Sequence, residues 1–169
     1  MRTLTLRYLM RRYALPAILI AVLGLLTCSP GEPPSETAVA PEKKRAEQIR
    51  DETHKFHKDG LVSARVVEDQ LAGKDFMPGG NLAEYAKDGK EYSVFFTERR
   101  NADQAMFLSM DYRDVLTDPK FIPSFGGFFG MDAEVPTMVF QKGKYVVGVT
   151  GLDLEDADQA ARLIAGYLN

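Results

Sequence analysis

Apolar and polar positions predict four strands and four helices in the part of the chain after residue 41. Alternating, β-branched stretches predict strands over residues 61–67 and 92–96. Two further alternating stretches, residues 135–140 and 145–150, are separated by Gln141-Lys142-Gly143-Lys144 and predict a β-hairpin. We expect these strands to form a sheet that helices cover on at least one face, because this packing buries the apolar face of the sheet economically.

Helical spacing predicts the first two helices. Ala46, Ile49 and Phe56, with Thr53 between the last two, are spaced three or four residues apart, which indicates a narrow-faced helix that ends at Gly60. Pro78-Gly79-Gly80 is typical of a turn. Asn81 followed by Glu84 is a capping-box signature, so a short helix is expected over residues 82–87.

Residues 102–116 alternate like a strand in places and step like a helix in others. The lack of β-branched residues before Val115, together with Asn101 and Gln104 as a cap, favours a helix. A glycine- and phenylalanine-rich loop is expected over residues 121–132. The last helix begins after Asp153, and its apolar face comprises Ala157, Ala160, Ala161, Ile164, Tyr167 and Leu168. The fold class predicted is α/β (α+β): a single small domain with a mixed sheet of about four strands, helices, and a C-terminal β-hairpin plus helix.

The N-terminus has the organisation of a secretion signal. Residues 1–27 carry four arginines and no acid, and residues 14–26 are an apolar run that includes Pro16. A bilayer-spanning helix needs about 20 apolar residues, so this shorter run fits a secretory signal better than a permanent anchor. A plain signal peptide or an uncleaved short anchor remains the alternative, and Arg11-Arg12 fits a twin-arginine signal less well.

The end of this run, Leu25-Leu26-Thr27-Cys28, is followed by the polar stretch that begins Ser29-Pro30-Gly31. It resembles a bacterial lipoprotein signal, although Thr27 stands where Gly, Ala or Ser is usual. The resemblance implies that Cys28 receives a diacylglyceryl group and becomes the new N-terminus. It divides the chain into a signal peptide (1–27), a lipidated Cys with a Pro/Ser-rich tether (28–41) and an α/β domain (42–169).

Two or more acyl chains, palmitate among them, would hold such a protein stably on a membrane. The expected location is therefore extracytoplasmic and membrane-anchored, on the periplasmic face. Ser29 favours the outer membrane in a Gram-negative host, because an Asp after the Cys signals inner-membrane retention in many lipoproteins of this kind.

Charge and cysteine content exclude several classes of function. The chain has 169 residues and a net charge of −3, which falls to −7 once the four arginines of residues 1–27 are removed. An acidic domain repels phosphate backbones, so no nucleic acid is expected as a partner. Cys28 is the one cysteine, which excludes both an intramolecular disulfide and a cysteine-rich zinc module.

Catalytic patterns are not found in the sequence. His54 and His57 are spaced for one helical face but sit among charged residues, where a solvated surface is the default. Ser124 is not part of a Gly-x-Ser-x-Gly elbow, and Asp111 is expected on the outer face of its helix. We assign no catalytic residue, metal ligand or cofactor.

The most unusual stretch is residues 125–131, which contain three Phe and three Gly. Glycines lower the stability of a fold through their conformational entropy, so this composition is expected only where the backbone needs glycine and the rings can pack. One interpretation is a loop whose rings plug the core; the other is a loop that binds a ligand or partner through Phe125, Gly126, Gly127, Phe128 and Phe129.

The final third, from Val135-Pro136-Thr137 through the hairpin and Gly151 to the last helix, resembles the C-terminal half of the thioredoxin fold. The resemblance implies that Pro136 is cis and faces the binding site. Thioredoxin-like oxidoreductases carry Cys-x-x-Cys after their first central strand, whereas Thr97-Glu98-Arg99-Arg100-Asn101 stands here. Without a cysteine at that place, thiol–disulfide exchange is not expected.

The function predicted from the sequence is therefore that of a membrane-tethered extracytoplasmic lipoprotein. Its acidic domain is expected to act as a non-catalytic binding or accessory module in the cell envelope, with an envelope protein or a small ligand as its partner. A redox-inactive thioredoxin-like module and an enzyme of unrecognised type remain as alternatives.

Overall fold

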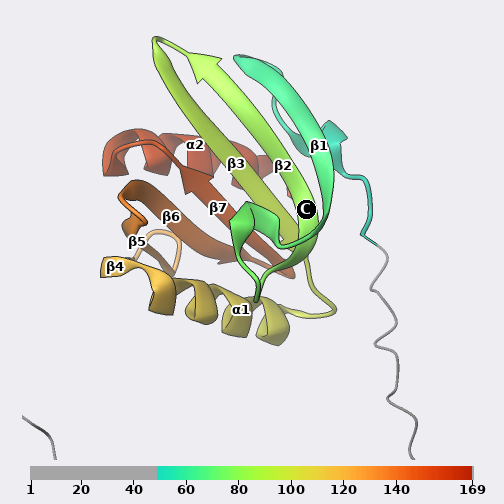
Figure 1. Ribbon diagram of the computed structural model, residues 1–169, viewed down its shortest axis with the longest axis vertical. Coiled ribbons are helices and arrows are strands. Elements are labelled where there is room, and N and C mark those ends of the chain that lie inside the picture. Colours follow the sequence, from blue (N-terminus) through green and yellow to red (C-terminus); the bar gives the residue numbers. More distant parts are fainter. Residues whose placement is uncertain (1–48, 169) are drawn as a thin grey trace, which may run out of the picture. The chain divides into compact units, whose positions relative to one another are not determined.

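The computed structural model describes residues 49–168, which belong to one compact unit, Arg45–Asn169. The predicted signal peptide, Cys28 and the tether lie outside the described residues. Seven strands form a single sheet with two α-helices and two short 3₁₀ turns (Figure 1). In chain order the elements are η1 (Thr53–Lys55), β1 (Leu61–Asp69), η2 (Leu71–Gly73), β2 (Pro78–Lys87), β3 (Lys90–Glu98), α1 (Ala102–Val115), β4 (Thr117–Ile122), β5 (Gly127–Asp132), β6 (Val135–Lys142), β7 (Tyr145–Thr150) and α2 (Leu154–Tyr167).

The strands lie in the order β1-β2-β3-β7-β6-β5-β4, and all neighbours are antiparallel. Strands β1 to β3 form one meander. Helix α1 then carries the chain to the far edge of the sheet, and β4 to β7 form a second meander that returns to the middle. The result is that β7 pairs with β3, with Glu98 opposite Tyr145.

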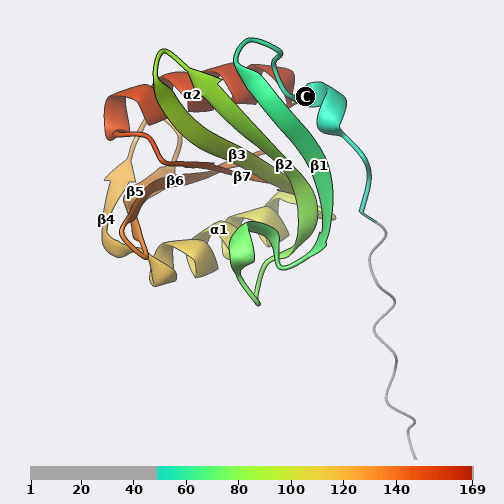
Figure 2. The same ribbon diagram turned by 45° about the horizontal axis from the view of Figure 1, so that its top comes forward.

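Helices α1 and α2 cover opposite faces of the sheet (Figure 2). Successive residues of a strand point to opposite faces, so β3 contributes Phe95 to the α1 side and Val94 and Phe96 to the α2 side. The α2 side holds the larger core, in which Phe140 and Ile164 are buried. Burial on both faces explains the uninterrupted apolar runs at residues 94–96 of β3, 138–140 of β6 and 145–147 of β7.

Both helices begin as the sequence predicts. The Asn101 side chain accepts a hydrogen bond from the Gln104 amide (2.9 Å), and Asp153 accepts one from the Asp156 amide (3.1 Å). Most residues expected to face the sheet are buried: Ala105, Leu108 and Tyr112 in α1, and Ala157, Ala160, Ala161 and Ile164 in α2. Leu168, directly after α2, is buried too, whereas Tyr167, expected on the same face, is exposed. The two later helices and the C-terminal hairpin followed by a helix are therefore confirmed.

The α+β single-domain class is confirmed, but the expected mixed sheet of about four strands is wrong. The sheet has seven strands and is entirely antiparallel. The missing strands are β2, β4 and β5, all of which contain glycine or proline. Glycine and proline are typical of turns and loops, so their presence predicts no strand in these segments.

Close backbone contacts explain why those glycines lie in strands. A Cβ on Gly79 would approach the Glu68 carbonyl oxygen to 2.2 Å, and one on Gly80 would approach the Phe96 carbonyl oxygen to 2.5 Å. In β5, a Cβ on Gly127 would lie 2.4 Å from the Val139 carbonyl oxygen. Glycine is required at these positions because neighbouring atoms leave no room for a side chain, and not because the chain turns.

The two earlier helices are also wrong within the described residues. Residues 82–87 belong to β2, where alternate side chains such as Ala83 and Tyr85 point into the core. Residues 49–52 are not helical, and only the short η1 follows before Phe56 enters the core. The remaining part of that first expected helix, residues 42–48, lies outside the described residues.

Pro136 lies in β6, which pairs antiparallel with β5 and β7. Its backbone oxygen accepts a hydrogen bond from the Gly151 amide (2.8 Å). All peptide bonds of residues 49–168 are trans, so the cis proline implied by the thioredoxin resemblance is not found at this position.

Candidate functional site

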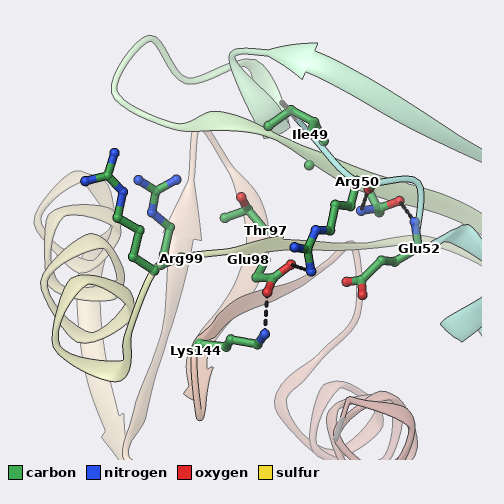
Figure 3. Close-up of a pocket in the computed structure, with 10 residues that line it drawn as sticks. Ile49, Arg50, Glu52, Thr97, Glu98, Arg99 and Lys144 are labelled. Carbon is green, nitrogen blue, oxygen red and sulfur yellow. Dashed lines mark hydrogen bonds and ion pairs between the residues drawn. The ribbon is translucent and has the colours of Figure 1, made fainter. Parts of the chain in front are cut away.

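A cavity of about 380 Å³ opens where β3 ends, beside the turn between β6 and β7 (Figure 3). Its volume falls in the range of small-molecule sites. Charged and polar side chains dominate its lining, which comprises Ile49, Arg50, Glu52, Gly80, Asn81, Thr97, Glu98, Arg99, Arg100 and Lys144. Three chain segments far apart in sequence meet here: residues 49–52, the β2–β3 pair and the β6–β7 turn.

The backbone around the cavity is held by buried polar contacts. Asn81, which is 3% exposed, donates a hydrogen bond to the Arg50 carbonyl oxygen (3.1 Å) and accepts one from the Glu52 amide (2.9 Å). Thr97 donates its hydroxyl hydrogen to the Gly79 carbonyl oxygen (2.7 Å). The Asn81 side chain therefore holds residues 50–52 against the sheet through these two hydrogen bonds. It does not cap a helix, the role that its sequence pattern predicts.

Glu98 lies between two cations of this cavity (Figure 3). Its carboxylate is 3.7 Å from the Arg50 guanidinium and forms an ion pair with Lys144. The Lys144 backbone is placed independently, because its carbonyl oxygen accepts a hydrogen bond from the Arg99 amide (2.8 Å). The β3–β7 register and the Asn81 hydrogen bonds together bring a carboxylate and two cations from three segments to one point.

The ion pair between Glu98 and Lys144 favours the charged form of both side chains. The hydrogen bond from Lys144, with a smaller contribution from Arg50, holds the pKa of Glu98 below its ordinary value, although burial opposes this. The same hydrogen bond raises the pKa of Lys144. The lining holds four cations, Arg50, Arg99, Arg100 and Lys144, against two carboxylates.

The second carboxylate, Glu52, is engaged outside this group. It forms an ion pair with Lys55 (2.8 Å), and both side chains are largely buried. Lys55 also donates a hydrogen bond to the Tyr145 hydroxyl (2.7 Å). Burial alone would lower the pKa of Lys55, but its hydrogen bonds to Glu52 and Tyr145 raise it overall. Glu52 therefore links residues 52–55 to one another at the edge of the cavity. Glu98 is the carboxylate paired with the cavity cations Arg50 and Lys144.

The donor set of this cavity suits binding of an anion. Guanidinium and ammonium groups recognise carboxylates and phosphates through charge-assisted hydrogen bonds. The side chains that line it include no His, Cys or Ser, and the Thr97 hydroxyl already donates to a backbone carbonyl. A nucleophile paired with a general base is therefore not found among these lining residues.

No family model matches the chain, and a search of curated proteins finds no match in sequence. Within residues 49–168, no helix has the length and apolar character needed to cross a bilayer. Any functional assignment consequently depends on the residues of the chain itself.

The binding residues predicted from the Gly/Phe-rich stretch lie away from this cavity and on both faces of the sheet. Phe125 packs on Phe140 on the α2 side, with ring centroids 4.6 Å apart, and Phe129 packs against the same core. Phe128 lies on the α1 side, next to Phe121. Gly126 is at the turn with φ +62°, Gly127 is in β5, and Pro136 is half-buried in β6. The structure does not bring these residues together on one surface.

The two histidines have different surroundings. His54 is exposed, whereas His57 is buried and stacks on Tyr85 with ring centroids 4.3 Å apart. Among the described residues, no three His, Cys, Asp or Glu side chains are grouped to hold a metal ion. Asp111 is exposed on α1, as its helical spacing predicts.

The sequence patterns do not identify Arg50, Asn81, Glu98 or Lys144 as site residues. Asn81 has the pattern of a helix cap, and Lys144 that of a turn residue. The available signal was Arg99-Arg100 directly after a strongly predicted strand, because strand ends are frequent binding positions. The partners Arg50 and Lys144 could not be found from sequence, because the position of Lys144 depends on the pairing of β3 with β7 and that of Arg50 on the hydrogen bonds of Asn81.

Proposed function

We propose that the chain is a membrane-tethered extracytoplasmic lipoprotein whose domain is a non-catalytic binding module for a carboxylate-bearing ligand. The observation that supports binding is the cavity at the end of β3, where Arg50 and Lys144 already hold a carboxylate of the protein itself. A carboxylate of a ligand has the same charge and the same planar geometry as that group.

The tether is proposed on the sequence alone, from the lipobox-like Leu25-Leu26-Thr27-Cys28. Ile49, the first of the described residues, lines the same cavity. In the proposed arrangement, Cys28 anchors the protein and the domain binds its ligand within reach of the membrane.

Intact-mass measurement of the protein extracted from bacterial membranes tests the tether. The expected species begins at Cys28 and carries added acyl mass, and Cys28→Ser should abolish both the acyl mass and the membrane fraction. An unmodified species that begins after Cys28, or an uncleaved chain, would overturn the lipoprotein assignment and leave the binding site to be tested separately.

Calorimetric titration of the full chain in a non-ionic detergent tests the binding site. Succinate is the probe, succinamide is its uncharged counterpart, and inorganic phosphate is the competing anion class. We expect saturable binding of succinate that weakens as salt is added, no binding of succinamide, and weaker binding of phosphate.

Arg50→Gln should weaken succinate binding about tenfold, because it removes one charge-assisted contact. Lys120→Gln is the matched control, since Lys120 is an exposed cation on β4 at the far edge of the sheet. Equal affinity of the wild type and Arg50→Gln, or no saturable binding of succinate, would refute the proposed function. Tighter binding of phosphate than of succinate would refute the carboxylate class.

A further inference from the structure

Glu98 occupies the position where an anionic ligand would be held. Its carboxylate pairs with Arg50 at 3.7 Å and with Lys144, the two cations that reach this position from opposite sides of the cavity (Figure 3). The Glu98 side chain is 23% exposed, whereas Arg50 is 73% and Lys144 46% exposed. Arg50 and Lys144 are therefore accessible to solvent, although both already pair with the less exposed Glu98 carboxylate.

We propose that Glu98 is a built-in competitor of the anion site, which a ligand carboxylate displaces from Arg50 and Lys144. This inference rests on the function proposed above and assigns a regulatory role to one residue of that site. In the ligand-free protein Glu98 compensates the two cations, and in the bound protein the ligand takes over that role.

The ion pairs of Glu98 are not needed to hold the segments that carry its partners. Asn81 fixes the backbone of residues 50–52 through two hydrogen bonds, and the Arg99 amide fixes Lys144 through its carbonyl oxygen. The pairing of β3 with β7 fixes Glu98 itself. Because the framework is held by these other contacts, the carboxylate can leave its partners without loss of the local fold.

Ion pairs of this exposure contribute little to stability, since solvent screens them. Weak ion pairs between Glu98 and the two cations favour displacement, because a ligand then loses little free energy in breaking them. The pKa of Glu98 is lowered chiefly by its hydrogen bond from Lys144, so the internal pair favours the ionised form that competes with a ligand carboxylate. A neutral ligand cannot compensate Arg50 and Lys144 once Glu98 has left, so the internal carboxylate also selects against uncharged molecules.

Substitution Glu98→Gln tests this inference, because it keeps the shape of the side chain and removes its charge. With succinate as the probe and the full chain in a non-ionic detergent, Glu98→Gln should bind about three- to tenfold more tightly than the wild type. The matched control is Glu84→Gln, which removes a carboxylate paired with Arg65 (2.7 Å) on the neighbouring strands, and which should leave the affinity unchanged. Thermal unfolding checks that each variant is folded.

Glu98→Asp provides a second test that does not depend on the first variant being folded. The shorter side chain draws the carboxylate away from Arg50, so succinate affinity should again rise. Unchanged or weaker binding by the folded Glu98 variants, with succinate still bound by the wild type, overturns the competitor role and leaves the proposed function standing. Absence of saturable binding in the wild type and in both variants overturns the proposed function itself.

Discussion

The Tyr85 hydroxyl lies 3.1 Å from Nδ1 of His57, and the two rings are stacked with centroids 4.3 Å apart. The same hydroxyl donates to the His57 carbonyl oxygen (3.2 Å), and Tyr92 stacks on Tyr85 in turn. This stack joins the segment before β1 to strands β2 and β3. Burial, together with the nearby Lys87 ammonium, lowers the pKa of His57, while Asp59 opposes this weakly.

A lowered pKa at His57 predicts that the protein loses stability as the pH falls below about 6.5. Under those conditions the unfolded chain takes up a proton before the folded protein does, so stability is fully present above that pH. It should decline as the pH falls toward the lower folded-state pKa, with a slope of at most about 1.4 kcal/mol per pH unit. Urea unfolding at several pH values between 5 and 8 measures this slope, in a range where carboxylates such as Asp59 stay ionised.

His57→Phe keeps a stackable ring without a titratable nitrogen, and it should remove that slope between pH 5 and 6.5. His54→Gln is the control, because His54 is exposed, and the slope should persist in it. If the slope is the same in His57→Phe and the wild type, His57 is not its source.

Gly148 and Phe95 form a second relationship that predicts a large effect of a single methyl group. They are opposite each other in the β7–β3 pair, and a Cβ on Gly148 would lie 2.0 Å from Cζ of the Phe95 ring. Gly148→Ala should therefore lower the free energy of unfolding by about 1–3 kcal/mol, as overpacking of a core does. Gly166→Ala is the matched control: Gly166 lies in α2 with open space around its Cα, and alanine there should raise stability by about 0.5 kcal/mol or more. Equal urea midpoints for the wild type and Gly148→Ala would contradict the tight packing of Phe95.

The fold could be predicted from sequence only where the local pattern and the tertiary environment agree. Helix α2 has a cap at Asp153 and a continuous apolar face, so its local signals match its place on the sheet. In β2, by contrast, Gly79 and Gly80 have the composition of a turn but serve a close approach of three strands. Composition cannot distinguish a glycine that turns from one that makes room, because the difference lies in the neighbouring strands.

The candidate site was less predictable than the fold for a related reason. Arg50, Glu98 and Lys144 are separated by at least 46 residues from one another. The pairing of β3 with β7 brings Glu98 near Lys144, and the Asn81 hydrogen bonds hold Arg50 beside them. Local patterns instead drew attention to Phe125 and its neighbours, whose composition is unusual but whose rings pack on separate faces. The Gly- and Phe-rich composition of residues 125–131 thus reflects how the rings pack in the core. The residues of the polar cavity form no recognisable pattern within any one stretch of sequence.

Asn81 links the stability of residues 50–52 to binding at the cavity, which predicts a combined effect of its removal. The side chain is buried and makes two hydrogen bonds to backbone groups of Arg50 and Glu52. Asn81→Ala should lower the free energy of unfolding by about 1–3 kcal/mol, because it removes two partly buried hydrogen bonds and leaves the Glu52 amide and the Arg50 carbonyl oxygen without this partner. It should also weaken succinate binding severalfold, since Arg50 is then no longer held over the cavity.

Asn101→Ala separates the two effects. Asn101 also bonds to backbone, as the cap of α1, and its removal should cost about 1 kcal/mol of stability without a change in succinate affinity. Amide hydrogen exchange gives an independent readout, because the Glu52 amide should exchange faster in Asn81→Ala but not in Asn101→Ala. If both variants lose stability and neither loses affinity for succinate, the two hydrogen bonds of Asn81 are purely structural and do not position Arg50 for binding.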